Sequence, residues 1–154
     1  MRRSVSPEDM QALEKEAFAA GLSELLVMER AANAVTSALT DMLGGSAKGK
    51  TVLFLCGRGN NGGDGLASAR QFALAGGIPL LAIPQEPGTE QTRVMMNSCS
   101  AMGLREVSLE EAELCPLDAA VDALQSLSEK AGIGNGTVTL LFKLVAMAYV
   151  TEFA

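Results

Sequence analysis

A glycine-rich stretch at residues 57–65 constrains the possible folds more than any other part of the chain. It follows the apolar run 51–56 directly and precedes a helix-compatible segment at residues 66–75. A short apolar run that ends in glycines before a helical segment is typical of a strand, a tight loop and a helix. We therefore expect backbone N–H groups and a helix N-terminus at the mouth of a sheet, where they can bind an anionic or polar ligand.

The composition sets limits on the partners of the chain. With 154 residues, of which 48% are apolar, the chain is long enough for one domain with a buried core. Its net charge of -6 provides no broad basic surface, so we expect neither a nucleic-acid partner nor a membrane partner. The most apolar late stretch, residues 137–150, is shorter than the roughly 20 residues of a membrane span and contains Lys143.

The titratable residues narrow the possible chemistry and the compartment. The cysteines Cys56, Cys99 and Cys115 are odd in number and form no CxxC pair, which favours a reducing compartment. Because the N-terminus has no apolar leader, we expect the protein in the cytoplasm. The chain contains no histidine, so general acid–base catalysis would have to use other side chains or water.

Periodicity and breakers predict two N-terminal helices within residues 7–45. Ser6, a proline and two acids favour a helix start at residue 7, and that helix should end at Ala19. Apolar residues at three- and four-residue steps predict a second helix from Ser23 to about Leu43.

A parallel α/β core is predicted for residues 51–124. Beyond the first strand and helix, we expect further elements at residues 78–84 (strand), 89–102 (helix), 108–113 (acidic turn or short helix) and 119–124 (strand). The buried stripe of the helix at 89–102 should comprise Val94, Met95, Cys99 and Met102. Residues 125–154 form a divergent C-terminal segment, in which 137–150 reads either as a strand or as a buried helix.

The spacing of Gly57, Gly59 and Gly62 satisfies the G-x-G-x-x-G pattern of dinucleotide-binding loops. Glu86 follows the second predicted strand, where an acid could bind a ribose hydroxyl. A phosphate-binding loop of the Walker type is excluded, because Gly63 stands where that motif requires lysine. An NAD(P)-dependent oxidoreductase is therefore one interpretation of the loop.

The dinucleotide pattern does not require Asn60, Asn61 or Asp64. Amide and carboxylate oxygens are hard ligands that alkali and alkaline-earth ions select. Alternatively, the asparagines tolerate left-handed conformations and Asp64 caps the following helix. The combination of all three polar residues among five glycines favours a binding function.

The run at residues 57–70, which begins Gly-Arg-Gly-Asn-Asn-Gly-Gly-Asp-Gly, resembles the signature of the YjeF N-terminal domain family. Enzymes of that family are NAD(P)H-hydrate epimerases, also called NAD(P)HX epimerases or apolipoprotein A-I-binding proteins. Residues 25–32 resemble the second helix of the family, and residues 119–124 resemble one of its later strands. The likeness extends over about residues 7–124.

The resemblance implies a three-layer, Rossmann-like parallel sheet flanked by helices, usually in a homodimer. It also implies an isomerase that interconverts the R and S forms of hydrated NADH or NADPH. By matched position, the hydrate would be bound by Asn60, Asn61, Gly62, Gly63 and Asp64. A potassium ion would be held by Asn61 and Asp122, although an acid at the end of a strand could instead cap the next helix.

The sequence departs from the family after Asp122. The family continues there with a glycine-rich turn and later an Asp-x-Pro-Ser-Gly segment that supplies its acid, whereas here residues 123–127 are Ala-Leu-Gln-Ser-Leu and no proline follows Pro116. We therefore expect a sheet that is incomplete at its C-terminal end, a substituted segment after about Leu124, and no identifiable catalytic residue. A non-catalytic nucleotide-binding or dimerisation module of the same family is the alternative function.

Overall fold

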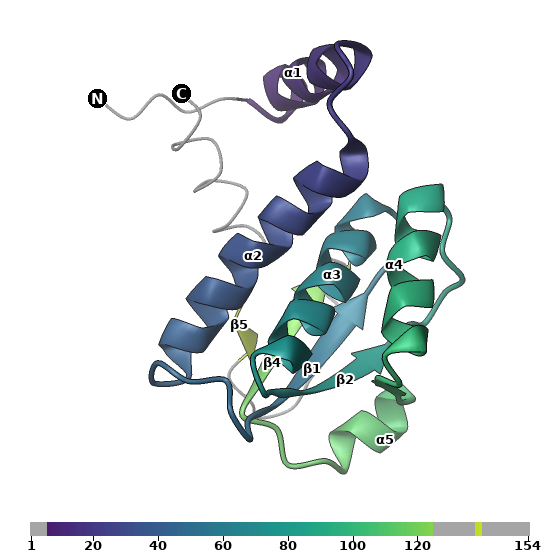
Figure 1. Ribbon diagram of the computed structural model, residues 1–154. Coiled ribbons are helices and arrows are strands. Elements are labelled where there is room, and N and C mark those ends of the chain that lie inside the picture. Colours follow the sequence, from purple (N-terminus) through teal and green to yellow (C-terminus); the bar gives the residue numbers. More distant parts are fainter. Residues whose placement is uncertain (1–5, 125–137, 140–154) are drawn as a thin grey trace.

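The computed structural model describes residues 6–124 and 138–139 and shows an α/β fold built on one parallel sheet (Figure 1). The helices are α1 (Pro7–Ala19), α2 (Glu24–Met42), α3 (Asn60–Leu74), α4 (Glu90–Ala101) and α5 (Leu109–Glu113). The strands are β1 (Thr51–Cys56), β2 (Ile78–Ala82), β3 (Arg105–Glu106), β4 (Ala119–Ala123) and β5 (Val138–Thr139).

The sheet has the order β3-β2-β1-β4-β5, and every neighbouring pair of strands is parallel. β1 lies at the centre, where Leu53 pairs with Leu80 of β2 on one side and with Ala120 of β4 on the other. Five of the six residues of β1 are buried, as expected for a strand covered on both faces. Because the strands are parallel, their carboxyl ends meet at one edge of the sheet.

Two apolar clusters define the layers around the sheet. Helices α2, α3 and α4 pack on one face (Figure 1), where Phe54 and Phe72 are fully buried with ring centroids 5.9 Å apart. On the opposite face, Leu53 and Leu55 of β1 pack in a cluster with Ala112 of α5. Helices therefore lie on both faces, which confirms the predicted three-layer α/β arrangement.

The predicted elements agree with the structure at most positions, but two predictions were wrong. The helix expected from residue 66 begins at Asn60, so the loop after β1 contains only residues 57–59. In α4, Val94 and Met102 are 39% and 40% exposed, and the buried residue that replaces them is Thr92. The strand β3 was not predicted, because two residues carry too little periodicity to identify a strand.

The later part of the chain extends the sheet beyond β4. The segment left open as a turn or a helix is the short helix α5, whose start is closed by a capping box between Ser108 and Glu111. The strand β5 lies within the stretch 137–150, and the other residues of that stretch lie outside the described part of the chain. The predicted domain boundary after Leu124 stays a prediction. Within residues 6–124 and 138–139, no helix has the length and apolar character needed to cross a membrane.

Candidate functional site

The turn at residues 57–59 joins the buried end of β1 to the start of α3, and each of its residues is held by a different element. The Gly57 N–H donates to the carbonyl of Ala123 in β4 at 3.1 Å. The Arg58 carbonyl accepts from the N–H of Gly88, in the loop between β2 and α4, at 2.7 Å. The Gly59 carbonyl accepts from the Thr92 hydroxyl of α4 at 2.9 Å. The turn is therefore fixed by three neighbouring segments.

Glycines are required after this turn because the chain packs too closely for side chains. A Cβ at Gly62 would lie 1.8 Å from the Gly57 carbonyl oxygen, and one at Gly65 would lie 2.6 Å from the Ala123 Cβ. A Cβ at Gly63 would lie 2.6 Å from the Met28 Cε. The described glycines with positive φ all lie elsewhere, at residues 21, 44, 45, 49, 76 and 103. Close approach, and not a left-handed backbone, explains the glycines of α3.

The predicted binding residues Asn60, Asn61, Gly62, Gly63 and Asp64 form the first five residues of α3. Gly59 is the N-cap and no side chain caps the helix, so the first intrahelical bond runs from the Gly63 N–H to the Gly59 carbonyl at 3.2 Å. The N–H groups of Asn60, Asn61 and Gly62 lack an acceptor within the helix and can bind an anion. The alternative that the asparagines adopt left-handed conformations is wrong, because both are helical.

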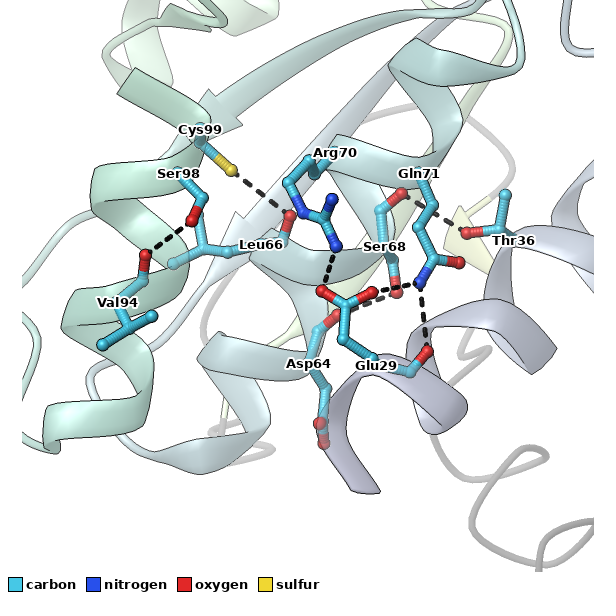
Figure 2. A network of polar contacts seen from close by, with 10 residues as sticks. All are labelled: Glu29, Thr36, Asp64, Leu66, Ser68, Arg70, Gln71, Val94, Ser98 and Cys99. Carbon is cyan, nitrogen blue, oxygen red and sulfur yellow. Dashed lines mark hydrogen bonds and ion pairs between the residues drawn. The ribbon is translucent and has the colours of Figure 1, made fainter. Parts of the chain in front are cut away.

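Asp64 does not cap α3, since it lies one turn past the N-cap, so the capping interpretation is also wrong. Its side chain is half-buried and points away from the polar network that its own backbone joins (Figure 2). Burial raises the pKa of the Asp64 carboxyl from its ordinary value of 3.8 to about 7, and the negative charge of Glu14 in α1 adds to the shift. A carboxyl with a pKa near neutrality can both donate and accept a proton at physiological pH.

Asp122 lies at the carboxyl end of β4 and is half-buried. Its Oδ1 accepts a hydrogen bond from the Leu124 N–H at 2.9 Å, a local bond of the kind that acids form at strand ends. The side chain of the next residue, Ala123, faces Gly65 of α3. Because side chains alternate along a strand, Asp122 points to the opposite face of the sheet.

The two predicted potassium ligands therefore share one edge of the sheet but approach it differently, Asn61 from α3 and Asp122 from the other face. Their amide and carboxylate oxygens are suitable for a potassium ion. Within the described part of the chain, no group of three or more acidic, cysteine or histidine side chains could hold a metal ion. The chemistry of the donors fits the ion.

A polar network that the sequence analysis did not identify anchors α2 to α3 (Figure 2). The Glu29 carboxylate accepts hydrogen bonds from Arg70, with which it forms an ion pair, and from the Gln71 side chain at 2.8 Å. The Gln71 amide also donates to the Glu29 carbonyl at 3.0 Å. Glu29 and Arg70 both lie within the segments that resemble the family. That resemblance was the only feature of the sequence that could have pointed to their pairing. The network holds α2, and with it Met28, against Gly63.

Thr92 is the second positioning residue that the sequence analysis missed. Its side chain is fully buried. The hydroxyl accepts from the Thr89 hydroxyl at 2.8 Å and donates to the Gly59 carbonyl. The spacing of apolar residues cannot reveal Thr92, because Thr92 is polar. It is buried because its hydroxyl forms hydrogen bonds with Thr89 and with the Gly59 carbonyl.

We expect Thr92→Val to loosen the start of α3, because valine keeps the shape of threonine but lacks the hydroxyl. The variant should lose about 1–2 kcal/mol of unfolding free energy, measured by urea denaturation, and the Gly63 amide should exchange its hydrogen faster. Thr92→Ser is the matched control, since serine keeps the hydroxyl and should preserve slow exchange at Gly63. Equal exchange rates in the two variants would show that the Thr92 hydrogen bond does not hold the turn.

We also expect the burial of Asp64 to cost stability as the pH rises. The folded protein binds the Asp64 proton more tightly than the unfolded chain, so its free energy of unfolding should fall between about pH 4 and about pH 7. Relative to Asp64→Asn, the wild type should lose up to a few kcal/mol over that window, since each pKa unit is worth about 1.4 kcal/mol. Urea titrations from pH 4 to pH 8 measure the difference in unfolding free energy between the two proteins. Asp41→Asn is the control, because Asp41 is exposed on α2. If the difference between the wild type and Asp64→Asn did not change with pH, burial would not raise the pKa of Asp64.

Comparison with known proteins identifies the family. Residues 24–151 match the family model described as YjeF-related protein N-terminus. The chain is 34% identical over 103 residues, which are 65% of this chain and 20% of the relative, to a bifunctional NAD(P)H-hydrate repair enzyme Nnr of Methanospirillum hungatei. It is 33% identical over 78 residues to an NAD(P)H-hydrate epimerase of Anopheles gambiae, which covers 51% of this chain and 34% of that protein.

A solved structure supports the same fold. The crystal structure of yeast ynu0 (YNL200c) matches with a TM-score of 0.68 and 23% identity, covering 97% of this chain and 66% of that one. The chain spans about a fifth of the length of the Methanospirillum relative and about a third of the length of the Anopheles relative. Since the family model covers most of its residues, the chain belongs to the YjeF-related protein N-terminus family.

Proposed function

We propose that this protein is an NAD(P)H-hydrate epimerase, an isomerase that interconverts the R and S forms of hydrated NADH or NADPH. One observation carries the proposal: the run Asn60-Asn61-Gly62-Gly63-Asp64, which resembles the hydrate site of the family, forms the open N-terminal turn of α3 at the carboxyl edge of the sheet. Curated relatives are named NAD(P)H-hydrate epimerase or repair enzyme, which supports the same reaction.

The free N–H groups of this turn suit the charged part of such a substrate. A dinucleotide hydrate carries phosphates, and unsatisfied N–H groups at a helix N-terminus favour anions. The turn is already fixed by β4, the β2–α4 loop and α4, so binding would cost little ordering of the backbone. Asn60 is exposed and Asn61 half-buried, which leaves both amides able to contact a ligand.

Inversion at the hydrated carbon requires a bond to that carbon to break and to form again, and a group that gives and takes a proton assists both steps. We assign this role to Asp64, because it lies at the start of α3 with the other predicted hydrate residues and because burial raises the pKa of its carboxyl to about 7. The chain has no histidine that could do the same. A potassium ion held by Asn61 and Asp122 would supply positive charge that orients the oxygen atoms of the substrate.

The protein would act as a homodimer in the cytoplasm. Three leucines of α1, α2 and the segment between them are available for self-association: Leu13, Leu22 and Leu26 are 55%, 47% and 61% exposed. Exposed apolar side chains can contribute to a protein contact. The net charge of -6 is consistent with a small-molecule substrate and not with nucleic acid.

The direct test incubates the purified protein with R-NADHX and potassium and follows conversion to the S form by chromatography. We expect turnover in the wild type and a loss of at least about tenfold, or 1.4 kcal/mol in the barrier, in Asn61→Ala and in Asp122→Ala. Asn97→Ala, at an exposed position of α4, is the matched control and should retain turnover.

Two other results would contradict the proposal. Binding of the hydrate without conversion would indicate a non-catalytic module of the family. A change in nicotinamide absorbance with a carbonyl substrate would indicate an oxidoreductase, the interpretation that depends on the G-x-G-x-x-G spacing and Glu86. That residue is exposed in the loop after β2.

A further inference from the structure

An open cavity of about 540 Å³ lies at the carboxyl ends of β2 and β3. Its apolar wall includes Ile83, Pro84, Val107 and Leu109, and its polar side includes two carboxylates, Glu106 and Glu110. The volume is in the range of small-molecule sites, and the mixture of apolar walls with few polar groups is typical of them. The cavity contains none of the residues assigned to the hydrate site.

The cavity and the glycine turn belong to the same edge of the sheet. β1, β2 and β3 are consecutive parallel strands, so the end of β3 lies about two strand spacings, of roughly 4.8 Å each, from the end of β1. The loop between β2 and α4 connects the two places directly. Pro84 of that loop lines the cavity, and Gly88 of the same loop donates its N–H to the Arg58 carbonyl. One extended ligand can therefore reach both.

The side chain of Arg58, in the turn, reaches this loop. A Cβ at Gly88 would lie 2.9 Å from the Arg58 Nε, so the guanidinium group lies against the loop between β2 and α4. The Arg58 side chain is exposed and positively charged. A phosphate group that bridges the two places would meet this charge.

The two carboxylates make the polar side of the cavity negatively charged. Glu106 and Glu110 are exposed, and within residues 6–124 and 138–139 neither side chain forms a hydrogen bond or an ion pair. The neighbouring Ser108 and Glu111 are already paired in the capping box of α5. Free carboxylates accept hydrogen bonds from sugar hydroxyls and repel phosphate.

We propose that this cavity binds the adenosine part of a dinucleotide whose phosphates lie at the start of α3, and that its two carboxylates select the free 2′-hydroxyl. The apolar wall provides a surface for the flat adenine base. The inference rests on the proposed function and makes it more specific: the protein prefers NADHX to NADPHX.

The preference is tested with the double variant Glu106→Gln/Glu110→Gln, which keeps the size of both side chains. The wild type should have a higher kcat/KM for NADHX than for NADPHX, and the double variant should reduce that ratio by about tenfold, equivalent to about 1.4 kcal/mol. Glu113→Gln removes one charge from the same helix outside the cavity lining and should leave the ratio unchanged. An unchanged ratio in the double variant, or a wild type that prefers NADPHX, would overturn the proposal.

A binding measurement separates this proposal from the epimerase itself. Titration calorimetry of the full chain with ADP and with adenosine 2′,5′-bisphosphate requires no turnover. We expect ADP to bind more tightly, and Leu109→Trp, which fills the cavity, to weaken ADP binding at least tenfold. Leu114→Trp is the control, because Leu114 is 87% exposed and does not line the cavity.

The outcomes are distinct. ADP binding that Leu109→Trp abolishes, in a protein that does not convert R-NADHX, would support the cavity and contradict the epimerase. Conversion of R-NADHX in a protein whose ADP affinity and KM are unaffected by Leu109→Trp would support the epimerase and contradict the cavity as its adenosine site. Absence of ADP binding in the wild type would also overturn the cavity proposal.

Discussion

The close approach of α3 to its neighbours is the constraint on which the rest of the structure depends. The helix begins three residues after β1 ends, and glycines at its first turns allow it to pack against the turn itself, the end of β4 and α2. Every added Cβ would meet backbone or a packed side chain at less than van der Waals distance. Two sets of hydrogen bonds hold the helix in that position. The Thr92 hydroxyl donates to the Gly59 carbonyl before α3, and Glu29 of α2 accepts from the Gln71 side chain of α3. Glycine lowers helix propensity by up to about 1 kcal/mol per residue, and the tertiary contacts outweigh this cost.

The same geometry explains why the sheet edge is suited to a polar ligand. A helix that starts without a side-chain cap leaves its first N–H groups for another acceptor, and here those groups belong to two asparagines and a glycine. Close packing also desolvates Asp64, which accounts for the raised pKa of its carboxyl. Asp122 reaches the same edge from β4. The packing that fixes α3 thus brings N–H groups without a helical acceptor and a carboxyl with a raised pKa to the same edge of the sheet as Asp122.

Much of this fold could be predicted from the sequence, because the strands and long helices follow patterns that are local. The continuous apolar run 51–56 and the apolar repeat of α2 predict their elements closely. The start of α3 could not be predicted, because glycine and asparagine favour loops and only tertiary contacts make them helical here. The burial of Thr92 and the exposure of Val94 depend on hydrogen bonds to a distant turn, which periodicity does not describe. Likewise, the motif predicts the binding residues, but only the folded chain shows that Asn61 lies on α3 while the side chain of Asp122 points to the other face of the sheet.

We propose that the open first turn of α3 binds the hydrated cofactor through its backbone N–H groups. Amide chemical-shift changes on addition of R-NADHX and potassium test this most directly, because they report on individual N–H groups and require no turnover. The largest shifts should occur at Asn60, Asn61 and Gly62, with smaller shifts at the carboxyl ends of β2 and β4 and none in the exposed part of α1. Saturable binding that leaves these three amides unperturbed, with the largest shifts elsewhere in the chain, would contradict it.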